Sequence, residues 1–211
     1  PAPAQGMATS VLRPNLAAPI ETSRAVRELY EASGTRPGRV TLVLPDNLAR
    51  VSLLNFPERP ATRRHLDEMV RFKLRRSVPF RLEEAVISYQ ALPDDGKDLN
   101  LLVALMLRPV VEQYEDAFEA AGARTGRVEL STLCLFNLLG KDMEKASSGG
   151  GDAALLNCSQ GYFSLMIVRN RKLLFYRCKS LRAQDAEADD VEPAETSFHR
   201  ELATSVSYYQ E

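Results

Sequence analysis

Residues 40–130 most constrain the fold, because apolar segments of strand length alternate there with amphipathic segments of helix length. The resulting order is β-α-β-β-α-β. The expected elements are an extended run at 40–57 broken at Pro45, a helix at 62–77, strands at 86–92 and 99–107, a helix at 109–122 and a short strand at 127–130. This order predicts an α+β unit, and no catalytic signature falls inside it.

Proline and glycine mark the ends of these segments. Pro79 disfavours helical geometry at the residue before it, so the first helix should end there. Pro109 fits the first turn of the second helix, and Gly122 suits the left-handed position after its end. Residues 40–44 are nearly all apolar, which predicts a strand buried on both faces. The apolar run at 99–107 is expected to be a central strand.

The flanks follow other patterns. Residues 1–20 are rich in Pro and Ala and predict an extended lead-in, after which Thr22 or Ser23 can cap a helix that ends at Gly34. The elements expected after 130 are a short helix at 133–139 ended by Gly140, a Gly/Ser joint at 147–152, strands at 153–157, 162–168 and 172–180, an acidic loop at 183–196 and a helix at 197–210. We expect a domain boundary at the joint.

Composition and motifs exclude several classes of protein. The 211 residues carry a net charge of −1, so no global field recruits nucleic acid or membrane. Cys134, Cys158 and Cys178 lack chelating spacing and are expected to be reduced thiols. No apolar run approaches the roughly 18–20 residues of a membrane span. Nucleophile, P-loop and metal-ligand motifs are absent, and His65 and His199 are expected on the surface.

The helix expected at 62–77 is amphipathic and basic. Its apolar stripe is Leu66, Met69, Val70 and Leu74. Between residues 59 and 81 there are eight basic side chains against two acidic ones. This surface could contact acidic partners or lipid headgroups, or it could be a solvated face. Nucleic acid ranks last, because no aromatic residues are interleaved for base stacking.

The segment LLNCSQGYFSLMIV, which starts at Leu155, predicts two strands joined by a small polar turn. Backbone N–H groups of such a turn can line an anion site. A phosphate-binding hairpin would also need an acidic residue at the end of its first strand, where this sequence has Asn157. A plain β-hairpin and a phosphate loop therefore both remain open.

Three stretches, in order, resemble the type IV pilus assembly protein PilM family: VTLVLPDNLARVSLLNFP, RRHLDEMVRFKLRRSVPFRLEEAVISYQAL and LLVALMLRPVVEQYEDAFEAAGARTGRVELSTLCLFNLL. The resemblance covers about residues 12–209. That family is similar to the division protein FtsA. The resemblance implies an α+β, actin-like (ribonuclease H-like) ATPase fold with an inserted β-α-β-β-α-β subdomain, incomplete at both ends.

The resemblance also implies that the chain is divided into four parts. Residues 1–45 would belong to the first actin-like lobe, 46–130 to the inserted interaction subdomain, 131–152 to a connecting helix and Gly/Ser linker, and 153–211 to the start of the second lobe. The family's first phosphate hairpin and its glycine-rich adenosine segment have no counterpart here. Since the sequence also begins with Pro1, we expect the middle of a longer protein or a reduced relative.

The family carries a D-x-G phosphate motif at the start of its second lobe. Asn157 stands where the Asp would be, Ser159 where the Gly would be, and Ser164 near the place of a downstream Thr. The expected degenerate phosphate loop is Asn157, Ser159, Gln160, Gly161 and Ser164. An amide keeps a carbonyl ligand but loses a charge, which weakens Mg²⁺ binding. We therefore expect no cofactor and no ATPase activity in this chain, whereas a full-length protein could bind ATP and Mg²⁺.

The function implied by the resemblance is contact rather than catalysis. The chain would be a cytoplasmic scaffold of the type IV pilus assembly platform, peripheral to the inner membrane and not inserted in it. It would dock the cytoplasmic N-terminal peptide of a PilN-like membrane protein, could self-associate, and would not bind nucleic acid. The expected docking residues are Arg71, Arg75, Arg76, Val78, Pro79 and Phe80. The alternative is an ATP-binding actin-like protein, either FtsA-like or like the type II secretion L protein.

Overall fold

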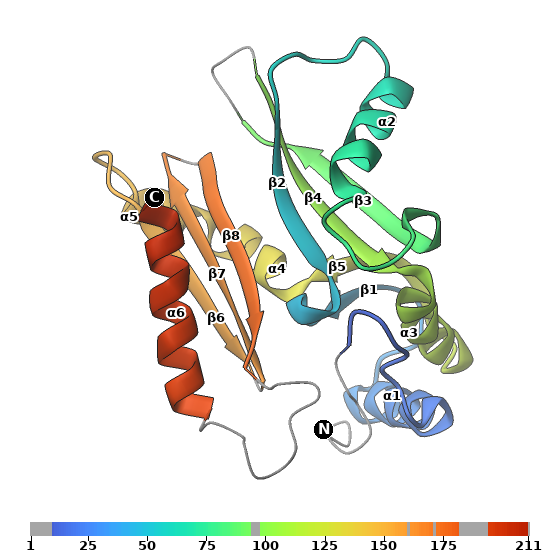
Figure 1. Ribbon diagram of the computed structural model, residues 1–211. Coiled ribbons are helices and arrows are strands. Elements are labelled where there is room, and N and C mark those ends of the chain that lie inside the picture. Colours follow the sequence, from blue (N-terminus) through green and yellow to red (C-terminus); the bar gives the residue numbers. More distant parts are fainter. Residues whose placement is uncertain (1–9, 94–97, 160, 171, 182–193, 211) are drawn as a thin grey trace. The chain divides into compact units, whose positions relative to one another are not determined.

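The computed structural model describes residues 10–93, 98–159, 161–170, 172–181 and 194–210 (Figure 1). The helices are α1 Pro19–Ser33, α2 Arg63–Leu74, α3 Arg108–Ala120, α4 Ser131–Leu138, α5 Gly140–Ala146 and α6 Ala194–Gln210, with 3-10 turns η1 Asp46–Leu48 and η2 Leu82–Glu84. The strands are β1 Arg39–Leu44, β2 Arg50–Phe56, β3 Ala85–Ala91, β4 Leu99–Leu107, β5 Arg124–Leu130, β6 Ala153–Ser159, β7 Tyr162–Arg169 and β8 Lys172–Ser180. The expected alternation of strands and helices is confirmed.

These strands form three sheets. β1 and β5 pair in parallel, β2, β4 and β3 form a second sheet in that order, and β6, β7 and β8 form an antiparallel third. β4 is central in its sheet, as predicted. The extended run at 40–57 is divided by Pro45 and η1, and its two halves join different sheets. A proline has no N–H for a strand ladder, so the break falls at this residue.

The chain folds as two compact units that interleave along the sequence. One comprises Pro1–Arg50, Asp67–Ser88 and Ala104–Ser131, and the other comprises Val51–Leu66, Tyr89–Val103 and Thr132–Glu211. β2, β3 and β4 each contribute residues to both. The boundaries expected at residues 45, 130 and 152 stay predictions.

In the first unit, α1 packs on α3, and α3 packs on β5. Leu42 and Leu44 of β1 are buried, whereas Val43 between them is 52% exposed. β1 is therefore covered on one face, and the prediction of a strand buried on both faces is wrong. A run of apolar letters does not distinguish the two cases, because an exposed valine still favours a strand.

The start of α1 differs from the prediction. The helix begins at Pro19, whose fixed backbone angle suits a first helical turn. The hydroxyl of Thr22 donates to the carbonyl of Ala18 over 3.2 Å, and that of Ser23 donates to the carbonyl of Pro19 over 2.9 Å. Both hydroxyls thus bond back to carbonyls, so the predicted cap at Thr22 or Ser23 is wrong. Gly34 has φ 65°, as expected for a left-handed helix end.

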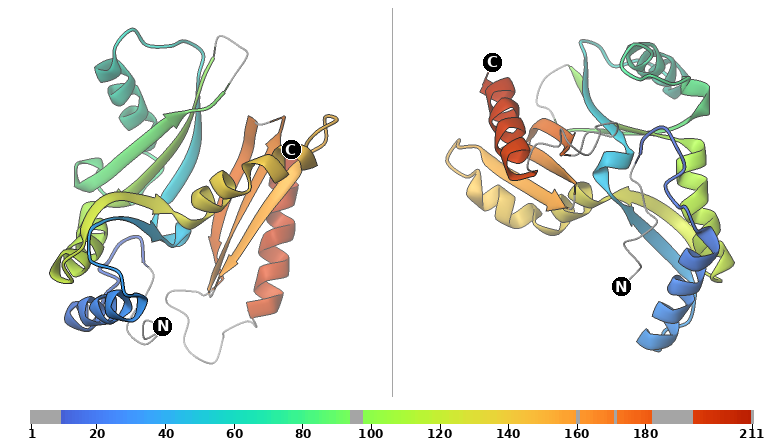
Figure 2. Two further views of the ribbon diagram at one scale, coloured as in Figure 1. Left: turned by 180° about the vertical axis from the view of Figure 1, so that it is seen from behind. Right: turned by 60° about the horizontal axis from the view of Figure 1, so that its bottom comes forward.

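In the second unit, β7 is the central strand of the third sheet, and residues 162–168 are all buried. Figure 2 shows α6 on one face of this sheet and α4 with α5 on the other. On the α6 face, the ring of Phe163 lies edge-on to Phe198 with centroids 5.3 Å apart. On the opposite face, Met166 and Val168 pack in one cluster with Met143 of α5.

The connection from 131 to 152 is more helical than predicted. The short helix predicted at 133–139 is confirmed as α4, which ends at Leu138, but the prediction that Gly140 ends it is wrong, because Gly140 begins α5. The reason lies in packing, because α5 buries Met143 against Ala153 and Met166 of the sheet. Two positive φ angles, 91° at Gly149 and 86° at Gly150, then turn the chain into β6.

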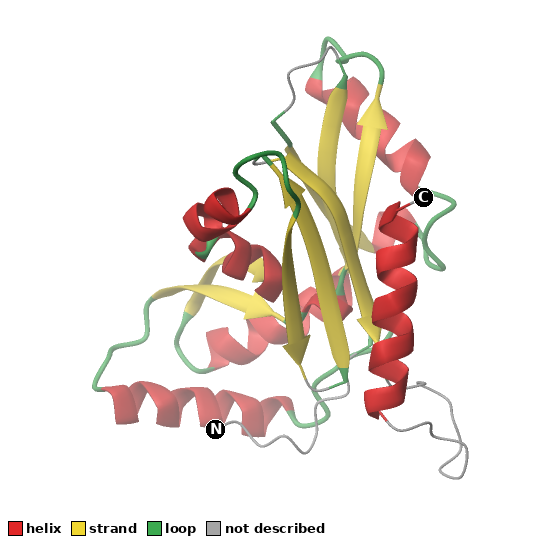
Figure 3. Ribbon diagram, turned by 90° about the vertical axis from the view of Figure 1, so that its left-hand side faces the viewer, coloured by secondary structure: helices red, strands yellow, loops and turns green. Residues whose placement is uncertain are grey.

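Helix α6 lies beside the third sheet (Figure 3). A polar cluster as well as apolar packing holds it there. Arg169 at the end of β7 binds the Asp152 carboxylate through two nitrogens, at 2.5 and 3.0 Å. The hydroxyl of Tyr209 donates to the same carboxylate over 2.6 Å. Further along α6, Glu201 pairs with Lys179 of β8 at 3.0 Å.

Some predictions concern residues that the structure does not describe. Residues 1–9 of the expected lead-in and residues 182–193, which include most of the expected acidic loop, lie outside the described residues, as do residues 94–97, 160, 171 and 211. Residues 194–196, expected in the acidic loop, belong to α6. Within the described part, His65 and His199 are exposed as predicted. None of the helices described there has the length and apolar character of a membrane span.

Candidate functional site

The β6–β7 hairpin places Asn157 directly opposite Ser164 in the strand register. Directly opposite residues share a sheet face. The side-chain nitrogen of Asn157 donates a 2.9 Å hydrogen bond to the hydroxyl of Thr132 in the first turn of α4. Ser164 and Thr132 are fully buried. The hairpin and α4 thus bring three uncharged polar side chains together in the second unit.

The turn of the hairpin contributes backbone geometry. Gly161 has φ 87°, a value that favours glycine, and its carbonyl accepts a 2.8 Å hydrogen bond from the N–H of Leu181. Ser159 is exposed at the end of β6 and pairs in register with Tyr162. Gln160, the remaining candidate, lies outside the described residues.

This hairpin site lacks the carboxylates that a divalent metal prefers. The two groups that lie within hydrogen-bond distance of each other are the side-chain amide of Asn157 and the hydroxyl of Thr132. Across the part of the chain that the structure describes, no group of three His, Cys, Asp or Glu side chains could hold a metal ion. The arrangement can offer hydrogen bonds, but it supplies no general base at Asn157.

The second candidate surface lies on α2 and the corner after it. Arg71, Arg75 and Arg76 are exposed, and one nitrogen of Arg71 donates to the carbonyl of Leu82 over 3.3 Å. Val70 and Leu74 on the opposite side of the helix are buried. The predicted stripe therefore orients α2 correctly, with the basic residues outward.

The corner at 78–80 combines partly buried and exposed positions. Val78 and Phe80 are half-buried, and Pro79 between them is exposed. The helix ends at Leu74, before Pro79, and the hydroxyl of Ser77 donates a 2.8 Å hydrogen bond to the carbonyl of Leu74. The six predicted docking residues thus lie on one helix end and the segment that follows it.

Sequence reasoning missed Phe72, which is 77% exposed on α2. A signal was available, because the apolar stripe at 66, 69, 70 and 74 leaves position 72 on the outer face. An aromatic side chain on an otherwise charged helix face is informative, since exposed large apolar groups often mark contact surfaces.

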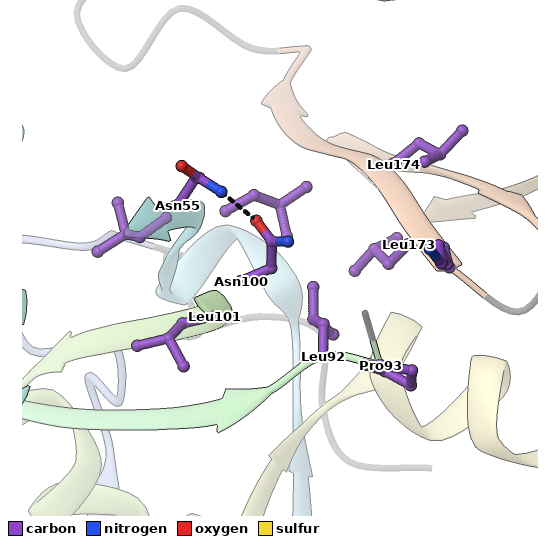
Figure 4. Close-up of a pocket in the computed structure, with 10 residues that line it drawn as sticks. Asn55, Leu92, Pro93, Asn100, Leu101, Leu173 and Leu174 are labelled. Atoms are coloured by element: carbon purple, nitrogen blue, oxygen red, sulfur yellow. Dashed lines mark hydrogen bonds between the residues drawn. The ribbon is translucent and has the colours of Figure 1, made fainter. Parts of the chain in front are cut away.

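Sequence reasoning also missed a pocket of about 310 Å³ in the second unit (Figure 4). Seven of its ten lining residues are leucine or proline, and the side-chain nitrogen of Asn55 donates a 2.9 Å hydrogen bond to Asn100 within it. The lining residues are Leu53, Leu54, Asn55, Leu92, Pro93, Asn100, Leu101, Lys172, Leu173 and Leu174. They come from segments far apart in sequence, so no local pattern could have indicated the pocket.

The fold is that of the PilM-type, actin-like α+β proteins. The match is to PilM in a structure of the PilM–PilN type IV pilus biogenesis complex, with a TM-score of 0.74 and 18% sequence identity. It covers 99% of this chain and 62% of that chain, so the present chain spans less than two thirds of the length of its solved neighbour. The PilM-like fold expected from the sequence is therefore confirmed.

Two other solved structures are more distant. The cytoplasmic domain of EpsL, an inner-membrane component of the type II secretion system of Vibrio cholerae, has a TM-score of 0.49 and 13% identity over 87% of this chain and 81% of its own. An actin-like ATPase-fold protein of unknown function from Bacteroides thetaiotaomicron has a TM-score of 0.41 and 8% identity, over 88% and 62%. No family model and no curated protein matches the sequence.

Proposed function

We propose that the chain is part of a scaffold protein of the type IV pilus inner-membrane assembly platform. The observation that carries the proposal is the PilM fold over 99% of the chain. That solved neighbour is in complex with PilN. By analogy, this protein would act in the cytoplasm at the inner membrane, by binding the cytoplasmic N-terminal tail of a PilN-like membrane protein.

The proposed docking surface is the end of α2 with the corner after it. The half-buried Val78 and Phe80 offer apolar contact area, and Pro79 between them stiffens the backbone. Arg71, Arg75 and Arg76 present guanidinium groups that can bind carboxylates or backbone carbonyls of an extended peptide. Self-association through the same surface is a competing use of these residues.

Calorimetric titration with a PilN-like N-terminal peptide tests this proposal. We expect saturable binding to the parent protein, and weaker binding to Phe80→Ala because an apolar contact is removed. A scrambled peptide of equal composition controls for charge. Absence of binding at high micromolar peptide, with the protein shown to be folded, would refute peptide docking.

A second candidate, nucleotide binding, is favoured by one observation. The hairpin pairs Asn157 with Ser164 and turns at Gly161 with a positive φ, a geometry suited to an anion site. We propose that this chain does not hydrolyse ATP, because Asn157 carries no charge to hold a metal ion or its waters. A nucleotide titration with Mg²⁺ tests binding separately from hydrolysis.

A further inference from the structure

The outer face of α2 joins an exposed aromatic ring to clustered positive charge. Phe72 near the end of α2 is 77% exposed, and the exposed Arg75 and Arg76 lie in the turn that directly follows the end of the helix at Leu74. Both arginines are exposed, and neither forms an ion pair with any of the described residues. Phe72 is thus an apolar group within a basic surface.

The charge around Phe72 is local. Residues 59–81 contain eight basic side chains and two acidic ones, although the whole chain has a net charge of −1. At physiological ionic strength an exposed charge acts over about 8 Å, so nearby surfaces experience this segment rather than the chain average. The occupant of the α2 face should therefore be anionic.

We propose that the outer face of α2 binds the surface of an anionic lipid bilayer. In this arrangement Phe72 enters the boundary between headgroups and acyl chains, and Arg75 and Arg76 bind lipid phosphates. Aromatic side chains favour that boundary, and guanidinium groups match phosphate geometry. The apolar side of α2, with Val70 and Leu74, stays buried in the protein, so the helix lies on the bilayer without entering it.

The shape of the surface favours a bilayer over an acidic peptide. Peptides generally bind in grooves or along strand edges, where several side chains surround them. Phe72 instead is exposed in the last turn of α2, and its neighbours in the sequence, Arg71 and Lys73, are also exposed. A single protruding ring flanked by cations suits a flat anionic surface that can admit it.

This contact goes beyond the proposed peptide docking and shares Arg75 and Arg76 with that surface. The two contacts can cooperate when the peptide is held through Arg71 and the corner at 78–80 while Arg75 and Arg76 bind lipid. One exposed basic residue strengthens binding to an anionic membrane surface by only about fivefold. A peptide from a membrane-anchored partner would hold the chain near the bilayer, where even a weak second contact increases the overall affinity. The lipid contact alone should therefore be reversible.

Vesicle flotation tests the proposal directly. The purified protein is mixed with vesicles of phosphatidylcholine alone, or of phosphatidylcholine with phosphatidylglycerol. We expect flotation only with the anionic vesicles, and its loss at about 1 M salt, where the screening length falls to about 3 Å. Flotation with neutral vesicles to the same extent, or none with anionic vesicles, would overturn the proposal. In the latter case an acidic protein surface becomes the better candidate occupant.

Paired variants test whether membrane binding depends on the α2 face or on charge anywhere on the protein. Phe72→Ser should weaken partitioning about tenfold through lost apolar burial. Arg75→Glu with Arg76→Glu should weaken it by at least about 25-fold, since two attractive charges are lost and reversed. Equal losses in the control variants described next would overturn the assignment to α2.

The controls lie on and after α1. Ile20→Ser removes an apolar side chain that is 84% exposed, and Arg24→Glu with Arg36→Glu makes the same charge change at exposed positions. All variants should retain the parent melting temperature. Phe80→Ala should weaken peptide binding but leave flotation intact, whereas Phe72→Ser should do the reverse. If the peptide does not bind but the protein still floats with anionic vesicles, only the proposed function is refuted.

Discussion

Tyr209 of α6 and Asp152 before β6 are joined by a 2.6 Å hydrogen bond, although 57 residues separate them in sequence. The hydrogen bond from Arg169 lowers the pKa of Asp152 below its ordinary value of 3.8, and the one from Tyr209 adds to this effect. The hydrogen bond to Asp152 raises the pKa of Tyr209 above its ordinary value of 10.0. Both shifts couple the attachment of α6 to pH.

The attachment of α6 should weaken at both pH extremes. A carboxyl group with a lowered folded-state pKa contributes stability above its unfolded value, and that contribution is lost as the pH falls below about 3.8. A phenol with a raised pKa contributes stability below about 10, which is lost as the pH rises through the folded value. Amide hydrogen exchange of α6 across pH should show this. Tyr209→Phe should remove the alkaline dependence, and its persistence would contradict the assignment.

The central strand β7 should be the most sensitive part of the second unit to loss of side-chain volume. Met166 is fully buried between β6 and β8, so Met166→Ala should lower the free energy of unfolding by about 2–5 kcal/mol. Leu156→Ala on β6 is the matched control, because Leu156 is 39% exposed and should cost much less. Urea unfolding measures both, and equal losses would argue against this packing.

Substitution of two glycines by alanine should change the stability of the protein in opposite directions. Gly34 has φ 65°, so Gly34→Ala should destabilise the protein by about 1 kcal/mol. Gly140 opens α5 with a negative φ and open space around its α-carbon, so Gly140→Ala should stabilise it by about 0.4–1 kcal/mol. Thermal unfolding of the two variants, compared with the parent, checks the signs.

Asn157→Asp should restore the charge that the β6–β7 hairpin lacks. The hydroxyl of Thr132 now accepts a hydrogen bond from Asn157, and it can rotate to donate to the new carboxylate, so the fold should tolerate the change. We expect Mg²⁺-dependent ATP binding to increase in calorimetry. Asn170→Asp, at the opposite end of the sheet's hairpins, makes the same chemical change at an exposed turn. An equal gain in that control would indicate a general charge effect.

The sequence was sufficient for most of the helices and strands and insufficient for their pairing. Periodicity identifies β4 and α3 because the pattern is local. The parallel pairing of β1 with β5 joins Leu44 to Leu130, and nothing near either residue specifies the other. The start of α5 was missed because Gly140 has a low intrinsic helix propensity, which the burial of Met143 overrides.

In the candidate site, too, contacts that are local in sequence could be predicted, whereas contacts that depend on tertiary packing could not. A hairpin alone predicts that Asn157 and Ser164 face each other, since the register follows from the turn. Thr132 could not have been predicted, because it lies 25 residues from Asn157 and reaches it through tertiary packing. Phe72 was predictable from the helical wheel, whereas the pocket beside Asn55 and Leu173 depends on segments whose meeting has no local signal.

The interleaving of the two units has a consequence for how the protein can be divided and altered. The chain leaves one unit for the other at residues 50, 66, 88, 103 and 131, so no single cut separates them. A gene fragment that ends at residue 50, 66, 88 or 103 would omit strands or helices from both units, and one that ends at residue 131 would still leave the second unit without residues 132–211. Recombination therefore cannot delete or exchange one unit as a single continuous segment. We expect the sequence of this protein to change by substitutions and by variation in its loops.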